Sequence, residues 1–212
     1  MPQIFCLGHS MTYGRWDTEG GWTQRLRREL DERSLENEDE EDFQVWNLGI
    51  PGEDSGQLLK RMGEELERRI YEPMQQVILI QVGANDIQYL RERDEVRVSE
   101  KEYRENLKKT IRKSREAADQ VMLIGEPPIT INGPIPWAEE KELSDNRMQR
   151  YRQIQKEVSE KHEIPFIDVR NLQTEDKWKK MLEDGCHPDN RGHQKIYKAV
   201  EQELKDQSIL QN

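Results

Sequence analysis

Short apolar runs and amphipathic, helix-like runs alternate along the whole chain, and this alternation constrains the fold more than any other feature. The run from Val77 to Val82 is almost continuously apolar, which is typical of a strand buried on both faces. Strands that alternate with helices form a parallel sheet with helices on both faces. We therefore predict an α/β protein of three layers, with a flavodoxin-like parallel sheet of about five strands. The strands are expected at Ile4–Leu7, Phe43–Leu48, Val77–Val82, Val121–Gly125 and Pro165–Asp168.

The helix-like runs predict two long helices in the second half of the chain, from about Glu100 to Ala118 and from about Glu139 to Lys161. Asp54 or Ser55 is expected to cap the helix that follows the second strand. Residues 127–137 are rich in proline and glycine and are expected to form an irregular loop. No repeat, linker or lid-like insertion is evident, so a single domain over residues 1–212 is predicted.

Composition narrows the classes of partner. The formal net charge of −10 argues against a nucleic-acid surface, which would carry a basic patch. The acidic run from Glu36 to Asp42 is expected to be a solvated loop, with a docking site for a basic partner as the alternative.

The cysteine count and the lengths of the apolar runs indicate in which cellular compartment the protein is expected. Only Cys6 and Cys186 are present, so no disulfide framework, metal-ligand cluster or cofactor is expected. No apolar run approaches the length of a membrane span, and the N-terminus begins in a strand rather than a signal peptide, which predicts a cytoplasmic protein. The sequence does not indicate an oligomeric state.

Polar residues recur where the apolar strands stop. Ser10 follows the first strand, Asn47–Gly52 closes the second, and Asn85 follows the third. The carboxyl ends of parallel strands lie side by side, so these residues are expected at one edge of the sheet. Asp184 and His187 lie in a loop near the C-terminus that can close over the same edge. A serine, a histidine and a carboxylate are the groups needed for nucleophilic acyl transfer.

Four short blocks resemble those of the SGNH hydrolases, also called GDSL esterases or lipases, in the order that the family shows. They are Gly8-His9-Ser10-Met11-Thr12, Asn47-Leu48-Gly49-Ile50-Pro51-Gly52, Gly83-Ala84-Asn85-Asp86 and Asp184-Gly185-Cys186-His187-Pro188. The resemblance covers nearly the whole chain. It implies a Ser-His-Asp triad, with Ser10 as nucleophile, His187 as general base and Asp184 as the residue that orients it. It also implies an oxyanion hole made by the Gly52 N–H, the Asn85 side-chain amide and the Ser10 N–H.

Each of these residues also has a structural interpretation. Ser10 or Asp184 can cap a helix, and Asn85 can be a turn residue. Asp86 is expected to bind loop amides rather than to act in catalysis. His162 and His193 match no motif and are expected at the surface.

One residue departs from the family pattern. The nucleophile block usually has aspartate between the glycine and the serine, and this chain has His9. The substitution removes a short acceptor that can hold backbone amides near the serine. We expect altered loop geometry or pH dependence, and a direct role of His9 as base is the alternative.

The resemblance implies a carboxylic ester hydrolase, with a small-molecule ester as partner. A compact chain without an evident lid insertion favours small or short-chain esters or thioesters. Candidates for the pocket wall are apolar and aromatic loop residues: Met11, Tyr13, Ile50, Ile87, Tyr89, Pro128, Ile129 and Trp137. A catalytically impaired ligand-binding protein on the same fold is the second hypothesis, motivated by His9. A flavodoxin-like nucleotide binder is disfavoured, because no glycine-rich phosphate loop follows any strand.

Overall fold

The computed structural model describes residues 2–36 and 42–211. Most of the acidic run expected as a solvated loop, residues 37–41, lies outside these described residues.

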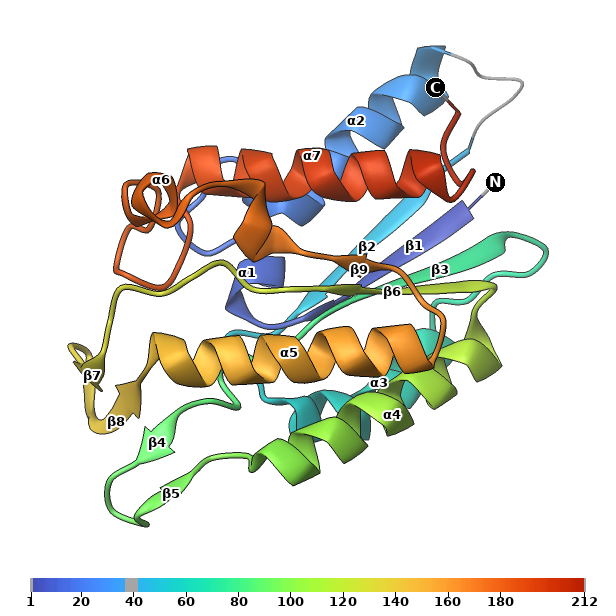
Figure 1. Ribbon diagram of the computed structural model, residues 1–212. Coiled ribbons are helices and arrows are strands. Elements are labelled where there is room, and N and C mark those ends of the chain that lie inside the picture. The colour runs from blue at the N-terminus through green and yellow to red at the C-terminus, as the bar shows by residue number, and fades with distance from the viewer. Residues whose placement is uncertain (1, 37–41, 212) are drawn as a thin grey trace.

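A five-stranded parallel sheet forms the centre of the molecule, with the strand order β2-β1-β3-β6-β9 (Figure 1). This sheet confirms the α/β prediction. Its strands are β1 (Pro2–Gly8), β2 (Gln44–Gly49), β3 (Gln75–Gln81), β6 (Gln120–Ile124) and β9 (Phe166–Ile167). Strand β1 pairs with both β2 and β3, and Gly8 lies beside Gly49 on one side and Gln81 on the other. The chain segments that leave these three strands therefore emerge next to each other.

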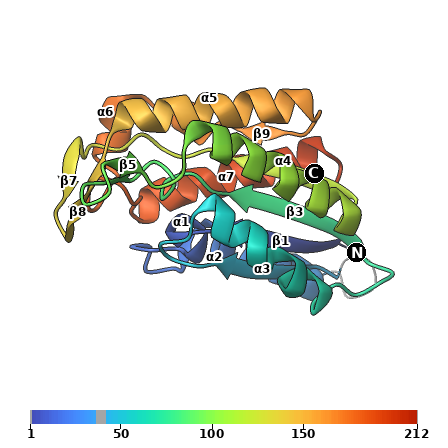
Figure 2. The same cartoon turned by 90° about the horizontal axis from the view of Figure 1, so that it is seen from below.

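Helices cover both faces of this sheet, and the alternation of side chains along each strand supplies a core to each layer. On β1, Phe5 and Leu7 pack toward α3, α4 and α5, which Figure 2 shows side by side, while Ile4 and Cys6 pack toward α2 and α7. The helices are α1 (Ser10–Tyr13), α2 (Gly21–Glu36), α3 (Ser55–Glu67), α4 (Glu100–Ala117), α5 (Asp145–Lys161), α6 (Glu175–Lys179) and α7 (Asn190–Asp206), with a 3-10 turn at Val169–Leu172.

Helix α3 begins as the sequence predicts. Its N-cap is Asp54, whose carboxylate accepts a hydrogen bond from the Gln57 N–H at 2.9 Å. The Gln57 side chain accepts in return from the Asp54 N–H, which completes a capping box. No helix in the described part of the chain is long and apolar enough to cross a membrane.

A second, antiparallel sheet was not predicted. It has the order β5-β4-β8-β7 and consists of β4 (Tyr89–Leu90), β5 (Glu95–Val96), β7 (Gly133–Ile135) and β8 (Ala138–Leu143). The prediction of a helix from Glu139 was wrong at its start. The charged residues of β8 favour a helix locally, but pairing with both β4 and β7 outweighs that preference. Figure 1 places this sheet beyond the same end of the central sheet as the α6–α7 loop.

Candidate active site

Ser10 lies at the turn where β1 ends and α1 begins. Its side chain is 7% exposed. Ser10 is the first residue of α1, whose N-cap is His9, so the structural interpretation of Ser10 as a helix cap is wrong. Asp189, and not Asp184, likewise caps α7. Both residues are therefore left with side chains that face other partners.

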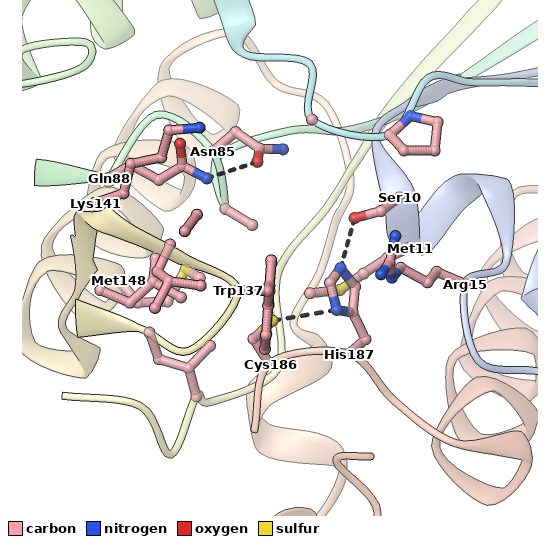
Figure 3. A pocket seen from close by; sticks show the side chains of 17 residues that line it. Ser10, Met11, Arg15, Asn85, Gln88, Trp137, Lys141, Met148, Cys186 and His187 are labelled. Carbon is pink, nitrogen blue, oxygen red and sulfur yellow. Dashed lines mark hydrogen bonds between the residues drawn. The ribbon is translucent and has the colours of Figure 1, made fainter. Parts of the chain in front are cut away.

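Ser10, His187 and Asp184 form a continuous chain of hydrogen bonds (Figure 3 draws its first link). Ser10 Oγ lies 2.8 Å from His187 Nε2, and His187 Nδ1 lies 2.7 Å from Asp184 Oδ2. The Asp184 carboxylate can only accept a hydrogen bond, so His187 Nδ1 carries the proton of the neutral imidazole and donates this bond to Asp184. The other nitrogen, Nε2, can then accept the Ser10 proton. This arrangement can remove the proton from a serine hydroxyl. The sequence predicted these three residues, and the structure brings all three together.

The Asp184 carboxylate is held by more donors than His187 alone. Its Oδ1 accepts from the His187 backbone N–H at 2.9 Å, and its Oδ2 also accepts from Trp16 Nε1 at 2.7 Å. Burial alone would raise the pKa of Asp184, but the bonds from His187 and Trp16 and the nearby imidazole bring it well below its usual range. Asp184 is therefore ionised at neutral pH. Trp16 was missed by the sequence analysis, because no motif contains it.

Asn85 lies in the segment that follows β3, and Gly52 lies in the segment that follows β2. The Asn85 amide nitrogen donates one hydrogen bond to the Glu53 carbonyl at 3.0 Å, and its oxygen accepts from Gln88 Nε2 at 3.0 Å. These two bonds fix the orientation of the Asn85 amide, and its second N–H can donate to a substrate oxygen. In Figure 3 the amide nitrogen faces the side of the pocket where Ser10 lies. Gly52 has φ +84°, a conformation that favours glycine. Apart from Gly52 and its two chain neighbours, none of the described residues has an atom within 4 Å of the position that a Cβ would take.

These residues line one pocket of about 300 Å³ (Figure 3). Ser10, Gly52 and Asn85 follow the ends of β1, β2 and β3, and His187 comes from the loop between α6 and α7. The unpredicted small sheet supplies much of the remaining wall. That wall includes Ile135, Trp137, Ala138, Lys141 and Leu143. Of the eight predicted wall residues, Met11, Ile129 and Trp137 line the pocket, and Tyr13, Ile50, Ile87, Tyr89 and Pro128 do not. The Trp137 and His187 rings lie 6.5 Å apart, centre to centre.

His9 is fully buried and does not face Ser10. Its Nε2 lies 2.7 Å from Glu126 Oε1, and its Nδ1 accepts a hydrogen bond from the Met11 N–H at 3.3 Å. Because both ring nitrogens have these partners, the geometry excludes the alternative of a direct base at Ser10. The expected loss of a backbone acceptor was also wrong, since the imidazole itself accepts from the nucleophile turn. Burial lowers the pKa of His9, but the Glu126 carboxylate outweighs that effect and raises it.

The remaining polar residues, Asp86, His162 and His193, have three different environments. Asp86 accepts from the Ser55 N–H at 3.0 and 3.2 Å, which confirms that it binds loop amides. Burial raises the pKa of Asp86 to about 6. His162 is half-buried at the end of α5. His193 was expected at the surface and is fully buried, because α7 packs on α2.

His193 connects α7 to the segment that carries Trp16. Its Nδ1 accepts from the Trp22 N–H at 3.3 Å, and its Nε2 lies 3.1 Å from the Arg15 carbonyl, to which it can donate. Burial is the main reason that the pKa of His193 falls from 6.5 to about 4. The folded protein therefore keeps this imidazole neutral at pH values where the unfolded chain binds a proton.

This difference predicts a pH-dependent stability. Below pH 6.5 the unfolded chain gains a proton at His193 and the folded protein does not, so stability is lost as the pH falls toward 4. The free energy of unfolding of the wild type, relative to that of His193→Asn, should decrease by about 1.4 kcal/mol per pH unit in this range. Urea unfolding of both proteins at several pH values measures it. A constant difference would contradict the assignment.

Asp184, Cys186 and His187 also form a group with ligand atoms within 4.8 Å of one another, which the sequence analysis did not expect. Cys186 Sγ lies 3.3 Å from Asp184 Oδ1 and 3.2 Å from His187 Nδ1. A metal at this position would require the thiolate. Burial, together with Asp184, strongly raises the pKa of the Cys186 thiol, so the sulfur remains protonated. The group fits a hydrogen-bonded cluster better than a metal site.

Solved structures of several ester hydrolases are similar to the chain. The lipase/acylhydrolase from Enterococcus faecalis is 25% identical, with a TM-score of 0.70 over 98% of this chain and 97% of that one. The aryl esterase from M. smegmatis is 15% identical, with a TM-score of 0.75 over 97% and 99%. The acetylxylan esterase Axe2 from Geobacillus stearothermophilus is 21% identical, with a TM-score of 0.69 over 96% and 93%.

Comparison by sequence gives the family directly. No curated protein sequence matches the chain. The sequence profile of the GDSL-like lipase/acylhydrolase family, in contrast, matches residues 6–195, which is most of its length. The chain therefore belongs to the GDSL-like lipase/acylhydrolase family.

Proposed function

We propose that this protein is a serine ester hydrolase that cleaves small or short-chain carboxylic esters or thioesters through an acyl-enzyme. The observation that carries the proposal is the hydrogen-bond chain from Ser10 Oγ through His187 to Asp184. The lipase/acylhydrolase, aryl esterase and acetylxylan esterase with the same fold support ester chemistry. A pocket of about 300 Å³ supports a small substrate.

In the first half of the reaction, His187 Nε2 takes the Ser10 hydroxyl proton while Oγ attacks the ester carbonyl carbon. The tetrahedral intermediate that forms carries its negative charge on the former carbonyl oxygen. The Gly52 N–H, the Asn85 amide and the Ser10 N–H are the donors that stabilise this oxygen. Ionised Asp184 stabilises the imidazolium that forms at His187 and keeps it oriented.

The imidazolium then gives its proton to the leaving oxygen or sulfur as the bond to the acyl carbon breaks, which leaves the acyl group on Ser10. In the second half, a water molecule attacks the acyl-Ser10 carbonyl while His187 takes a proton from it. Collapse of the second intermediate breaks the bond to Oγ, the imidazolium returns the proton to Oγ, and the acid is released.

Hydrolysis of p-nitrophenyl acetate, butyrate and octanoate tests the proposal. We expect the highest kcat/KM with the shorter esters, since the pocket is small, and loss of turnover in Ser10→Ala. Turnover that is equal in the wild type and in Ser10→Ala would contradict it.

A catalytically impaired binding protein remains the alternative, and it predicts ligand binding without turnover in the wild type. The substitution His9→Asp is not a clean test of this alternative. It would place a second carboxyl group beside Glu126, where His9 Nε2 now lies 2.7 Å from Oε1.

We expect Trp16 to position Asp184 for this reaction. Trp16 is a non-glycine residue with φ +67°, and its exposed indole donates to Asp184 Oδ2. Trp16→Phe keeps the ring and removes the donor. We expect a decrease in kcat of about tenfold with little change in KM, because the carboxylate that orients the imidazole loses one of its donors. Trp137→Phe is the matched control, because its ring lines the pocket without contacting Asp184. An unchanged kcat in Trp16→Phe, or an effect confined to KM, would contradict the positioning role.

A further inference from the structure

The charge of the pocket is opposite to that of the whole protein. The chain has 43 acidic and 33 basic residues. The residues that line the pocket nevertheless include two cationic side chains, Arg15 and Lys141, and no carboxylate among the described residues. A neutral ester gives no reason for this local reversal of sign.

Within the part of the chain that the structure describes, Arg15 has no carboxylate partner. Most arginines that the structure describes pair with acidic residues, as the exposed Arg28 does with Glu19 at 2.8 Å. Among the described residues no acceptor or carboxylate pairs with the Arg15 guanidinium, and its Nε is buried without a hydrogen-bond partner. Its contact is with the ring of Trp16, 4.9 Å from guanidinium carbon to ring centre. A guanidinium in this state retains its capacity to bind an anion.

Arg15 also lies on a definite side of the pocket. Its backbone N–H donates to the Ser10 carbonyl at 3.0 Å, so the residue is one turn beyond the nucleophile. Figure 3 shows Arg15 on the side of Ser10 and His187, and Lys141 on the side of Asn85 and Gln88. His187 must give its proton to the leaving group, so the leaving group lies on the His187 side. Arg15 is therefore next to the leaving alcohol rather than beyond the oxyanion donors.

We propose that the enzyme selects esters whose alcohol part carries an anionic group, a carboxylate or a phosphate, and that Arg15 binds this group. The inference rests on the proposed function and specifies its substrate class. The Arg15 fork donates two parallel hydrogen bonds to either oxyanion, and the Trp16 ring holds the guanidinium plane in place. No covalent step is added, because the anion only fixes the alcohol part beside His187.

Three acetate esters test the inference. They are 3-acetoxybenzoate and 3-acetoxyphenyl phosphate, which carry the anion on the leaving group, and 3-acetoxybenzamide, which is neutral. We expect a kcat/KM for at least one anionic ester about tenfold above that for the amide, despite the net negative charge of the protein. The ratio between benzoate and phosphate identifies which anion the site prefers. Equal rates for all three, or a preference for the amide, would overturn the inference.

The variant Arg15→Gln tests whether Arg15 causes the preference for anionic esters. KM for the preferred anionic ester should rise about tenfold more than KM for the amide, and Arg15→Lys should recover part of the loss. Lys141→Gln, at the other side of the pocket, should raise KM for the anionic ester less than Arg15→Gln does. Arg112→Gln removes an exposed charge on α4 and should change neither KM. If Arg15 only supports Trp16, Arg15→Gln will instead lower kcat equally for all three esters, which would overturn its role as the anion site.

Failure of this inference can be told from failure of the proposed function. Turnover of the neutral amide through Ser10 without an anion preference refutes the inference and leaves the function intact. If no ester is cleaved, calorimetry with Ser10→Ala still decides the anion site. Binding of 3-acetoxybenzoate that is at least about tenfold weaker in Ser10→Ala/Arg15→Gln supports the site, and equal binding in both refutes it.

Discussion

His187→Ala is expected to lower kcat for short p-nitrophenyl esters by about four orders of magnitude, with little change in KM. The imidazole lies 2.8 Å from Ser10 Oγ and acts on the proton that moves in the transition state, so its loss removes little ground-state binding. Asp184→Asn should lower kcat by about three to four orders of magnitude, because an amide at this position favours the wrong imidazole tautomer.

The matched control for both variants is His162→Ala, which removes a half-buried histidine at the end of α5 that contacts none of the three residues. Its kcat should equal that of the wild type. Folding of every variant is verified by circular dichroism and thermal unfolding. Retention of more than about a tenth of the wild-type kcat in folded His187→Ala would contradict the role of the base.

Asn85→Ala is expected to lower kcat by about two to three orders of magnitude, which is typical for the loss of one oxyanion donor. The amide is already held by Glu53 and Gln88, so it requires little reorganisation when charge develops on the substrate oxygen. The loss should appear in kcat more than in KM, since the bond strengthens in the transition state.

Asn85 also donates to the Glu53 carbonyl, so part of the effect in Asn85→Ala is structural. Asn47→Ala is the matched control, because Asn47 lies in β2 and its side-chain amide also donates to a backbone carbonyl, that of Tyr13, outside the pocket. If Asn47→Ala lowers kcat as much as Asn85→Ala does, the oxyanion role is contradicted.

The central sheet and the hydrogen-bonded residues at its edge could be predicted because both depend on local patterns. Continuous apolar runs such as Val77–Val82 identify buried parallel strands, and the register of β1 with β2 and β3 brings the strand ends together. Ser10 and Asn85 could therefore be placed at one edge of the sheet from the strand pattern, and the resemblance to the SGNH blocks added His187.

The small sheet could not be predicted in this way. Strand β8 reads Ala-Glu-Glu-Lys-Glu-Leu, a composition that favours a helix, and only pairing with β4 and β7 makes it a strand. These partners come from residues 89–90 and 133–135, so the decisive interactions with β4 are distant in sequence. Because this sheet supplies much of the pocket wall, the wall residues were mostly mispredicted.

Partners of single polar residues were also outside the reach of the sequence. His9 looked like the loss of an acceptor, but Glu126, 117 residues away, holds its imidazole so that it accepts from Met11. His193 looked like a surface residue, although it is buried between α7 and the segment after α1. Trp16 and Arg15 belong to no motif, and their positions beside Asp184 and in the pocket follow from tertiary packing.

The central claim is that Ser10 is an activated nucleophile, and reaction with a fluorophosphonate probe tests it most directly. After incubation at about pH 6 to 9, intact mass and peptide mapping locate the adduct. We predict one adduct per chain in the wild type, on Ser10, and none in Ser10→Ala. A folded wild type that stays unlabelled across this range, or an adduct that forms equally in Ser10→Ala, would contradict the account.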